Sequence, residues 1–157
     1  MPGPEELSLY EIDGYSIVYA LQTRLDASGW NVPVDLVRER WPSGDEVEPP
    51  AVWVLMDFNS TAPWELGSNG KEHEIFVHIF ATNSSQRDRL AEEITNLVRD
   101  IIPIYDWQDG NETNPSIVEY FNTQGEVEFS PIRAPLNAPK SEQWRAVVHA
   151  TLTRQDA

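Results

Sequence analysis

Apolar side chains near the N-terminus recur every three to four residues, which is the spacing of one helix face. The positions on this face are Gly14, Ile17, Val18, Leu21 and Leu25. Asp13 stands in front of them as a capping residue, and Gly29 follows them as a stop. We therefore predict a first helix over residues 14–27, preceded by an N-terminal arm at residues 1–12.

Alternation of apolar and polar side chains predicts strands in three later segments. These are residues 51–58, 72–81 and 143–153. In the second segment both faces are apolar, because Phe76 and Phe80 alternate with a row of aliphatic residues. Such a strand either lies in the middle of a sheet or uses its second face to contact another subunit.

A second helix is predicted directly after residues 72–81. The Ser-Gln-Arg-Asp sequence that starts at Ser85 resembles a capping box, and Asn83 and Ser84 are competing caps. The apolar stripe of this helix consists of Leu90, Ala91, Ile94, Leu97, Val98 and Ile101. We expect Pro103 to end the helix, because proline cannot donate the next backbone hydrogen bond.

The remaining segments are rich in proline and glycine and are predicted as loops, except that residues 31–50 are predicted to begin with an extended segment before the loop. They cover residues 31–50, 59–71, 103–115 and 131–142. Residues 117–121 and 126–130 flank an Asn-Thr-Gln-Gly sequence, which predicts a hairpin. The element order is then α-β-β-α-β-β-β. It indicates a single α+β domain over residues 1–157, with two helices packed on a mixed or antiparallel sheet of about four to five strands.

Net charge narrows the functions that this domain can have. The 157 residues include 26 acidic and 11 basic side chains, for a net charge of −15. A phosphate backbone would be repelled over most of such a surface, which argues against sequence-reading nucleic-acid binding. The absence of cysteine excludes disulfides, thiol nucleophiles and cysteine-based zinc sites. With no long apolar run and no signal-peptide pattern, we expect synthesis in the cytoplasm without a membrane partner.

The three histidines do not form a metal site in this pattern. His73 and His78 lie five residues apart on one predicted strand, so their side chains point to opposite faces. His149 could approach either of them only through the tertiary fold. The oxygen-rich segment 106–112 invites a calcium interpretation, but it lacks the ligand order of an EF-hand and is predicted as a polar turn. We predict no metal site and no cofactor.

Two pairs of carboxylates each lie on one face of a predicted strand: Glu72 with Glu74, and Glu126 with Glu128. General acid–base catalysis needs two carboxylates in different environments within a cleft, and nothing in the sequence marks a cleft. In so acidic a chain we interpret these pairs as a solvated face. No catalytic residue is predicted.

Aromatic side chains are the remaining candidates for function. Several of the six tryptophans lie in predicted loops, where they either anchor the loop to the core or contact another protein. Together with the second face of residues 72–81, they are the candidates for subunit contacts. These candidates are Phe76, His78, Phe80, Trp41, Trp64 and Trp107.

Four short segments in the middle of the chain carry a resemblance to a known family. They are PAVWV at 50–54, ELG at 65–67, EIFVHIFAT at 74–82 and RDRLA at 87–91. This succession resembles the tail terminator, or tail-completion, proteins of tailed bacteriophages and the neck proteins related to them. The resemblance covers residues 14–102, and the closing strand at residues 145–152 falls where the family has one.

The resemblance implies a structural virion protein that is not an enzyme. In that family the subunits form a ring, usually hexameric, that caps the tail tube and offers a docking face to the head connector. The implied partners are other copies of the chain, the tail-tube protein, the head-connector or neck protein and, in contractile tails, the sheath. Such a protein would assemble in the host cytoplasm and end at the head–tail junction of the virion.

An acidic ring would also suit the passage of DNA. Six copies of −15 would carry about −90 in total, and a pore without cations would let the phosphates slide past without specific binding. The candidate pore-lining residues are Glu72, Glu74, Glu126 and Glu128.

Two other functions are also compatible with the sequence. One is a head-completion or stopper protein on the portal side of the neck, which is again a structural role. The other, from a different class, is a small-ligand-binding or enzymatic domain of ferredoxin-like architecture with a pocket around His78 and the loop tryptophans. An activity lost on His78→Ala would favour this last function.

Overall fold

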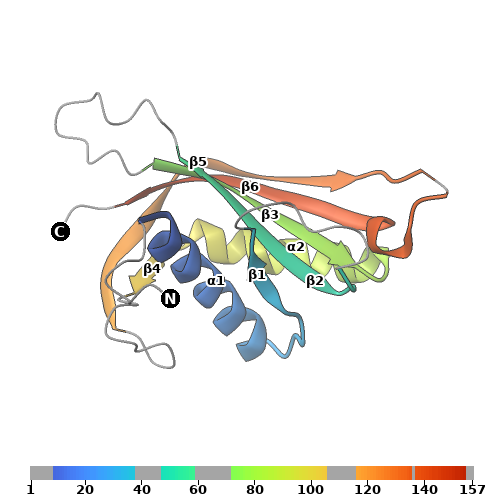
Figure 1. Ribbon diagram of the computed structural model, residues 1–157, viewed down its shortest axis with the longest axis horizontal. Coiled ribbons are helices and arrows are strands. Elements are labelled where there is room, and N and C mark those ends of the chain that lie inside the picture. The colour runs from blue at the N-terminus through green and yellow to red at the C-terminus, as the bar shows by residue number, and fades with distance from the viewer. Residues whose placement is uncertain (1–8, 38–46, 59–71, 106–115, 136, 155–157) are drawn as a thin grey trace, which may run out of the picture.

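Two α-helices pack against one six-stranded sheet in the computed structural model (Figure 1). The structure describes residues 9–37, 47–58, 72–105, 116–135 and 137–154. The helices are α1 (Leu9–Ala27) and α2 (Ser84–Arg99), and the strands are β1 (Val34–Leu36), β2 (Ala51–Phe58), β3 (Glu72–Ala81), β4 (Ile102–Tyr105), β5 (Ile117–Ile132) and β6 (Trp144–Arg154). A short 3-10 helix, Lys140–Glu142, precedes β6.

The strands follow the order β1-β2-β3-β6-β5-β4 across the sheet. β1 pairs in parallel with β2, and all other neighbours are antiparallel. The predicted class, α+β with a mixed sheet and two helices, is therefore confirmed, but the sheet has six strands instead of four to five. β3 lies between β2 and β6, so it is an inner strand, as one interpretation of its two apolar faces requires.

α1 begins at Leu9, so part of the predicted N-terminal arm is helical. Ile17, Leu21 and Leu25 are buried, as their spacing predicts. The prediction that Asp13 caps this helix is wrong, because the residue lies in the second turn and is completely buried. A buried carboxylate needs a polar partner, and the partner of this one lies on β3.

α2 begins at Ser84, and Asn83 is its N-cap. The Asn83 side chain accepts a hydrogen bond from the backbone N–H of Gln86 at 2.8 Å, which satisfies one of the free donors of the first turn. One of the predicted competing caps is therefore the actual cap, in place of the box that starts at Ser85. The buried residues of α2 are Leu90, Ala91, Ile94, Leu97 and Val98, which confirms the predicted stripe except for its last member.

The prediction that this helix continues to Pro103 is wrong. It ends at Arg99, because the backbone of Asp100 is extended, with a ψ of 174°. Ile101 therefore leaves the apolar stripe and is 59% exposed. Pro103 belongs to β4, where a missing N–H is tolerated because β4 is an edge strand.

The hairpin predicted around residues 122–125 is also wrong. Its two halves belong to one continuous strand, β5, which pairs with β6 before and after a register shift between Gln124 and Glu128. Gly125 lies within this shift and has a φ of 71°. Glycine with positive φ occurs both in hairpin turns and in β-bulges, so the local sequence is compatible with either.

Replacement of Gly125 by alanine is expected to destabilise the protein by about 1 kcal/mol, because alanine adopts positive φ less readily than glycine. No heavy atom lies within 4 Å of the position that a Cβ would take, so the effect would come from the backbone. Urea denaturation measures the change. Ser130→Ala, at an exposed position of the same strand, is the control, and equal stability of the two variants would contradict the bulge.

The segments predicted as loops are only partly irregular. β1 lies near the start of residues 31–50, where an extended segment is predicted, whereas Val47, in the part predicted as a solvent loop, is buried. Ile102–Tyr105 form β4 at the start of the segment 103–115, and residues 131–132 continue β5. The predictions for residues 1–8, 38–46, 59–71 and 106–115 lie outside the described residues.

The core lies between the helices and the sheet face that they cover. The three central strands contribute alternate residues to it: Val52, Val54, Met56, Ile75, Val77, Ile79, Ala146, Val148, Ala150 and Leu152. β2 and β3 have the bounds that the alternation predicts, and β6 is shifted by one residue. In all three strands the intervening residues point to the opposite side of the sheet.

Candidate functional site

Both α-helices of the described residues lie on the same side of the sheet, so within that part of the chain no helix covers the side chains on its other side (Figure 1). On β2, β3 and β6 these side chains form two rows that cross the strands. One row is Leu55, Phe76 and His149, and the other is Trp53, His78 and Val147. All six side chains are half-buried. We call the surface formed by these six residues the outer face.

The first row of the outer face joins an aromatic stack to two carboxylates. The ring of His149 stacks on Phe76 with a centroid distance of 4.6 Å and an interplanar angle of 18°. Its Nε2 lies 3.4 Å from a carboxylate oxygen of Glu74 on β3, and its Nδ1 lies 3.8 Å from one of Glu128 on β5. The fold therefore brings together one member of each predicted carboxylate pair, on the two sides of β6.

The other predicted site residues are not gathered at this cluster. Glu126 is exposed near the bulge of β5, and the side chain of Glu72 lies outside the described part of the chain. Phe80, predicted as a subunit contact, is only 1% exposed because Val47 and Ala51 pack over it. Its side chain therefore belongs to the interior of the chain. Also outside the described residues are Trp41, Trp64 and Trp107.

His78, in the second row, is held in a hydrogen-bonded chain. Arg145 donates from Nη2 to His78 Nδ1 at 2.8 Å and from Nη1 to Glu142 at 3.1 Å. The same guanidinium lies 4.5 Å from the ring centroid of Phe80. Burial, and secondarily the charge of Arg145, lower the pKa of His78 from 6.5 to about 4. The imidazole is therefore neutral at pH 7 and acts as an acceptor.

An NMR titration of His78 is expected to show a midpoint near pH 4, below the ordinary 6.5. Between pH 6.5 and pH 4 the imidazole of His78 takes up a proton in the unfolded protein but not in the folded protein. The free energy of unfolding therefore decreases as the pH falls through this range. Arg145→Met should raise this pKa only in part, since burial is the larger cause. A midpoint near 6.5 in the wild-type protein would contradict the arrangement.

The structure contains a buried pair of polar side chains that the sequence analysis did not predict. His73 Nε2 and Asp13 Oδ2 are 2.7 Å apart, and both side chains are 0% exposed. The ring of His73 also meets Phe121 edge-on at 5.9 Å between centroids. One signal was present: Asp13 precedes Ile17 by one helical turn, so a polar residue occupies the apolar face of α1. The pair links α1 to β3 and has no access to a substrate.

The histidines occupy the faces that the alternation predicts. His73 points into the core and His78 to the outer face, so they cannot share an ion. His149 shares the outer face with His78. Within the described segments, no three His, Asp or Glu side chains are placed to hold a metal ion.

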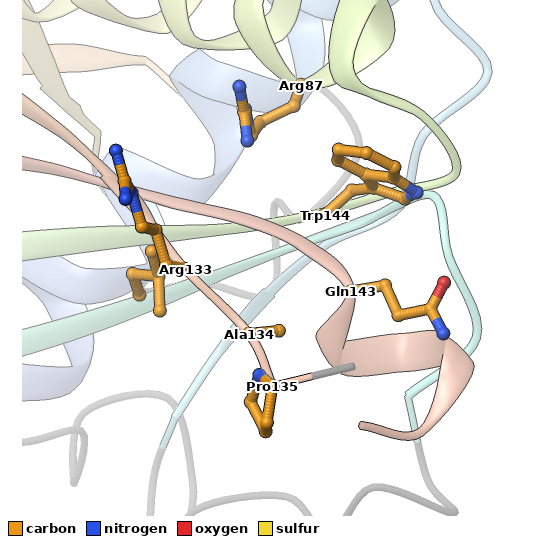
Figure 2. A pocket seen from close by; sticks show the side chains of 7 residues that line it. Arg87, Arg133, Ala134, Pro135, Gln143 and Trp144 are labelled. Carbon is orange, nitrogen blue, oxygen red and sulfur yellow. The ribbon is translucent and has the colours of Figure 1, made fainter. Parts of the chain in front are cut away.

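A pocket of about 380 Å³ lies at the end of the sheet, between the first turn of α2, the end of β5 and the start of β6 (Figure 2). It is lined by Arg87, Ile132, Arg133, Ala134, Pro135, Gln143 and Trp144. The guanidinium carbon of Arg87 is 5.9 Å from the ring centroid of Trp144. Three separate segments build this pocket, which is why no local motif indicated it.

No protein-family model matches the chain, and no curated protein matches its sequence. Neither of the helices in the described residues is both long and apolar enough to cross a membrane.

Proposed function

We propose that the chain is a structural protein of a tailed bacteriophage and forms the ring that caps the tail tube. The observation that carries this proposal is the outer face, where aromatic and aliphatic side chains stand in two cross-strand rows with no helix over them. The resemblance of residues 14–102 to tail terminator proteins supports the same function.

The composition of the outer face favours contact with another protein. An antiparallel sheet that is solvated on one side normally places polar residues there. Here Trp53, Leu55 and Phe76 occupy such positions. Covering apolar surface stabilises a contact by about 25 cal/mol per Å², and aromatic residues are enriched at the centres of protein interfaces. A neighbouring subunit would supply this cover.

The carboxylates beside the outer face are not among the six residues that a neighbour would cover, and they suit the wall of a ring that DNA crosses. Glu74 and Glu128 flank His149, and Glu126 is exposed within the register shift of β5. A pore with such walls offers no cations to the phosphates, so DNA would pass without being held. The net charge of −15 on each copy extends this repulsion over the whole ring.

Electron microscopy of negatively stained mixtures with the phage's tail-tube protein tests this function. We expect ring-shaped particles on the ends of the tubes. Bare tube ends together with monomeric protein would contradict the proposal.

A further inference from the structure

Two copies of this chain repel one another at long range, because each carries a net charge of −15. A local site where opposite charges meet would therefore favour a contact between like-charged copies, in addition to the apolar outer face. The pocket at the end of the sheet has the required character, because its lining includes two arginines and a tryptophan but no carboxylate (Figure 2).

We propose that the pocket formed by Arg87, Arg133 and Trp144 binds a carboxylate side chain of a second copy of the chain. This inference rests on the proposed function and specifies the contact through which the ring is built.

The two arginines differ in how they are held. Arg87 Nε binds a carboxylate oxygen of Asp88 at 2.9 Å, and its guanidinium faces Trp144, so its position is fixed by two neighbours. Arg133 is exposed. Figure 2 shows Arg87 extending from α2 and Arg133 from the segment that follows β5. Planar guanidinium groups match a carboxylate with two parallel hydrogen bonds, which makes Arg133 the main cation for an incoming glutamate or aspartate.

The rest of the pocket is suited to the stem of an acidic side chain. Ile132, Ala134 and Pro135 form an apolar wall, and Trp144 is 37% exposed. The methylene groups of a glutamate can pack on such a wall while its carboxylate reaches the arginines. Glu142 borders an adjoining pocket that also includes Arg133, but its carboxylate pairs with Arg145 at 3.1 Å.

The cationic and acidic groups occupy different positions on the chain. The exposed carboxylates of β5, Glu126 and Glu128, do not line the pocket. A contact between two different patches of identical chains is head-to-tail, and such contacts close into a ring when the rotation between neighbours permits. A contact between this pocket and a carboxylate elsewhere on the next copy is compatible with such a ring.

Sedimentation velocity of Arg133→Glu, with and without tail-tube protein, tests the pocket. We expect the association between copies to weaken at least about tenfold, because the reversed charge repels the incoming carboxylate. Ala134→Trp should weaken it as well, since the indole would fill the cavity while both arginines remain. Arg99→Glu makes the same charge change at the C-terminal end of α2, about 18 Å from Arg87 along the helix. This control variant should assemble like the wild type.

The possible results distinguish a failure of the pocket proposal from a failure of the proposed function. Wild-type protein that stays monomeric even with tail-tube protein overturns both the ring and this inference. A wild-type oligomer that Arg133→Glu and Ala134→Trp leave unchanged overturns the inference alone. Binding of duplex DNA that Arg133→Glu abolishes, with oligomerisation unchanged, would likewise overturn it in favour of a phosphate site. Circular dichroism and the melting temperature of each variant establish that it is folded.

Discussion

Replacement of Asp13 by alanine is expected to lower the free energy of unfolding by about 1–3 kcal/mol, because it leaves His73 buried without its carboxylate partner. The two side chains are 2.7 Å apart and both are completely buried. The pair also joins α1 to β3, so its loss would loosen the helix on the sheet. Urea denaturation followed by far-UV circular dichroism measures the change.

A double variant provides the control for this prediction. Asp13→Leu combined with His73→Phe should recover most of the lost stability, because replacing both partners of a buried hydrogen bond by apolar groups of similar shape can be nearly neutral. Phe121, which contacts His73, is apolar and would pack against the new side chain. A loss below about 1 kcal/mol for Asp13→Ala would contradict a structural role of the pair.

Phe76→Asp is expected to separate the subunits while leaving the fold of each intact. Its side chain is half-buried on the outer face and stacks on His149. A new carboxylate two residues along β3 from Glu74 would repel it and would lie at the proposed subunit contact. We expect each contact to weaken by about 2 kcal/mol or more, which is about thirtyfold in affinity. Sedimentation velocity across a dilution series measures this loss.

Ile101→Asp is the matched control for the outer face. Ile101 is more exposed than Phe76 and lies between α2 and β4, away from the six residues of the outer face. Its replacement introduces the same charge but should leave the oligomer unchanged. If both variants dissociate equally, added negative charge alone is responsible and the outer face is not the contact.

Sequence patterns predicted correctly those strands whose own residues alternate between a buried and an outward face. β2 and β3 were predicted with their actual bounds because eight and ten consecutive residues alternate between two faces. β4 was missed because it has four residues, includes Pro103, and is stabilised by pairing with the distant β5. Gly125 is compatible with both a hairpin and a bulge, and only the pairing of β5 with β6 on both sides of the register shift decides between them.

The candidate sites depended even more on contacts between distant residues. Asp13 has the right sequence context for a helix cap, and its actual role is set by His73, sixty residues away. The outer face could be predicted in part, because Phe76 and His78 share one face of a strand. The pocket at the end of the sheet could not, because Arg87, Arg133 and Trp144 meet only in the tertiary structure.

The mass of the protein in solution tests the central claim, assembly into a ring, most directly. Each copy weighs 17.9 kDa, so a ring of six would weigh about 107 kDa. Sedimentation equilibrium at several concentrations, with and without the tail-tube protein, would distinguish these masses. We expect a single closed oligomer near the larger mass, at least when tail-tube protein is present. A 17.9 kDa monomer under all of these conditions would contradict the proposed function.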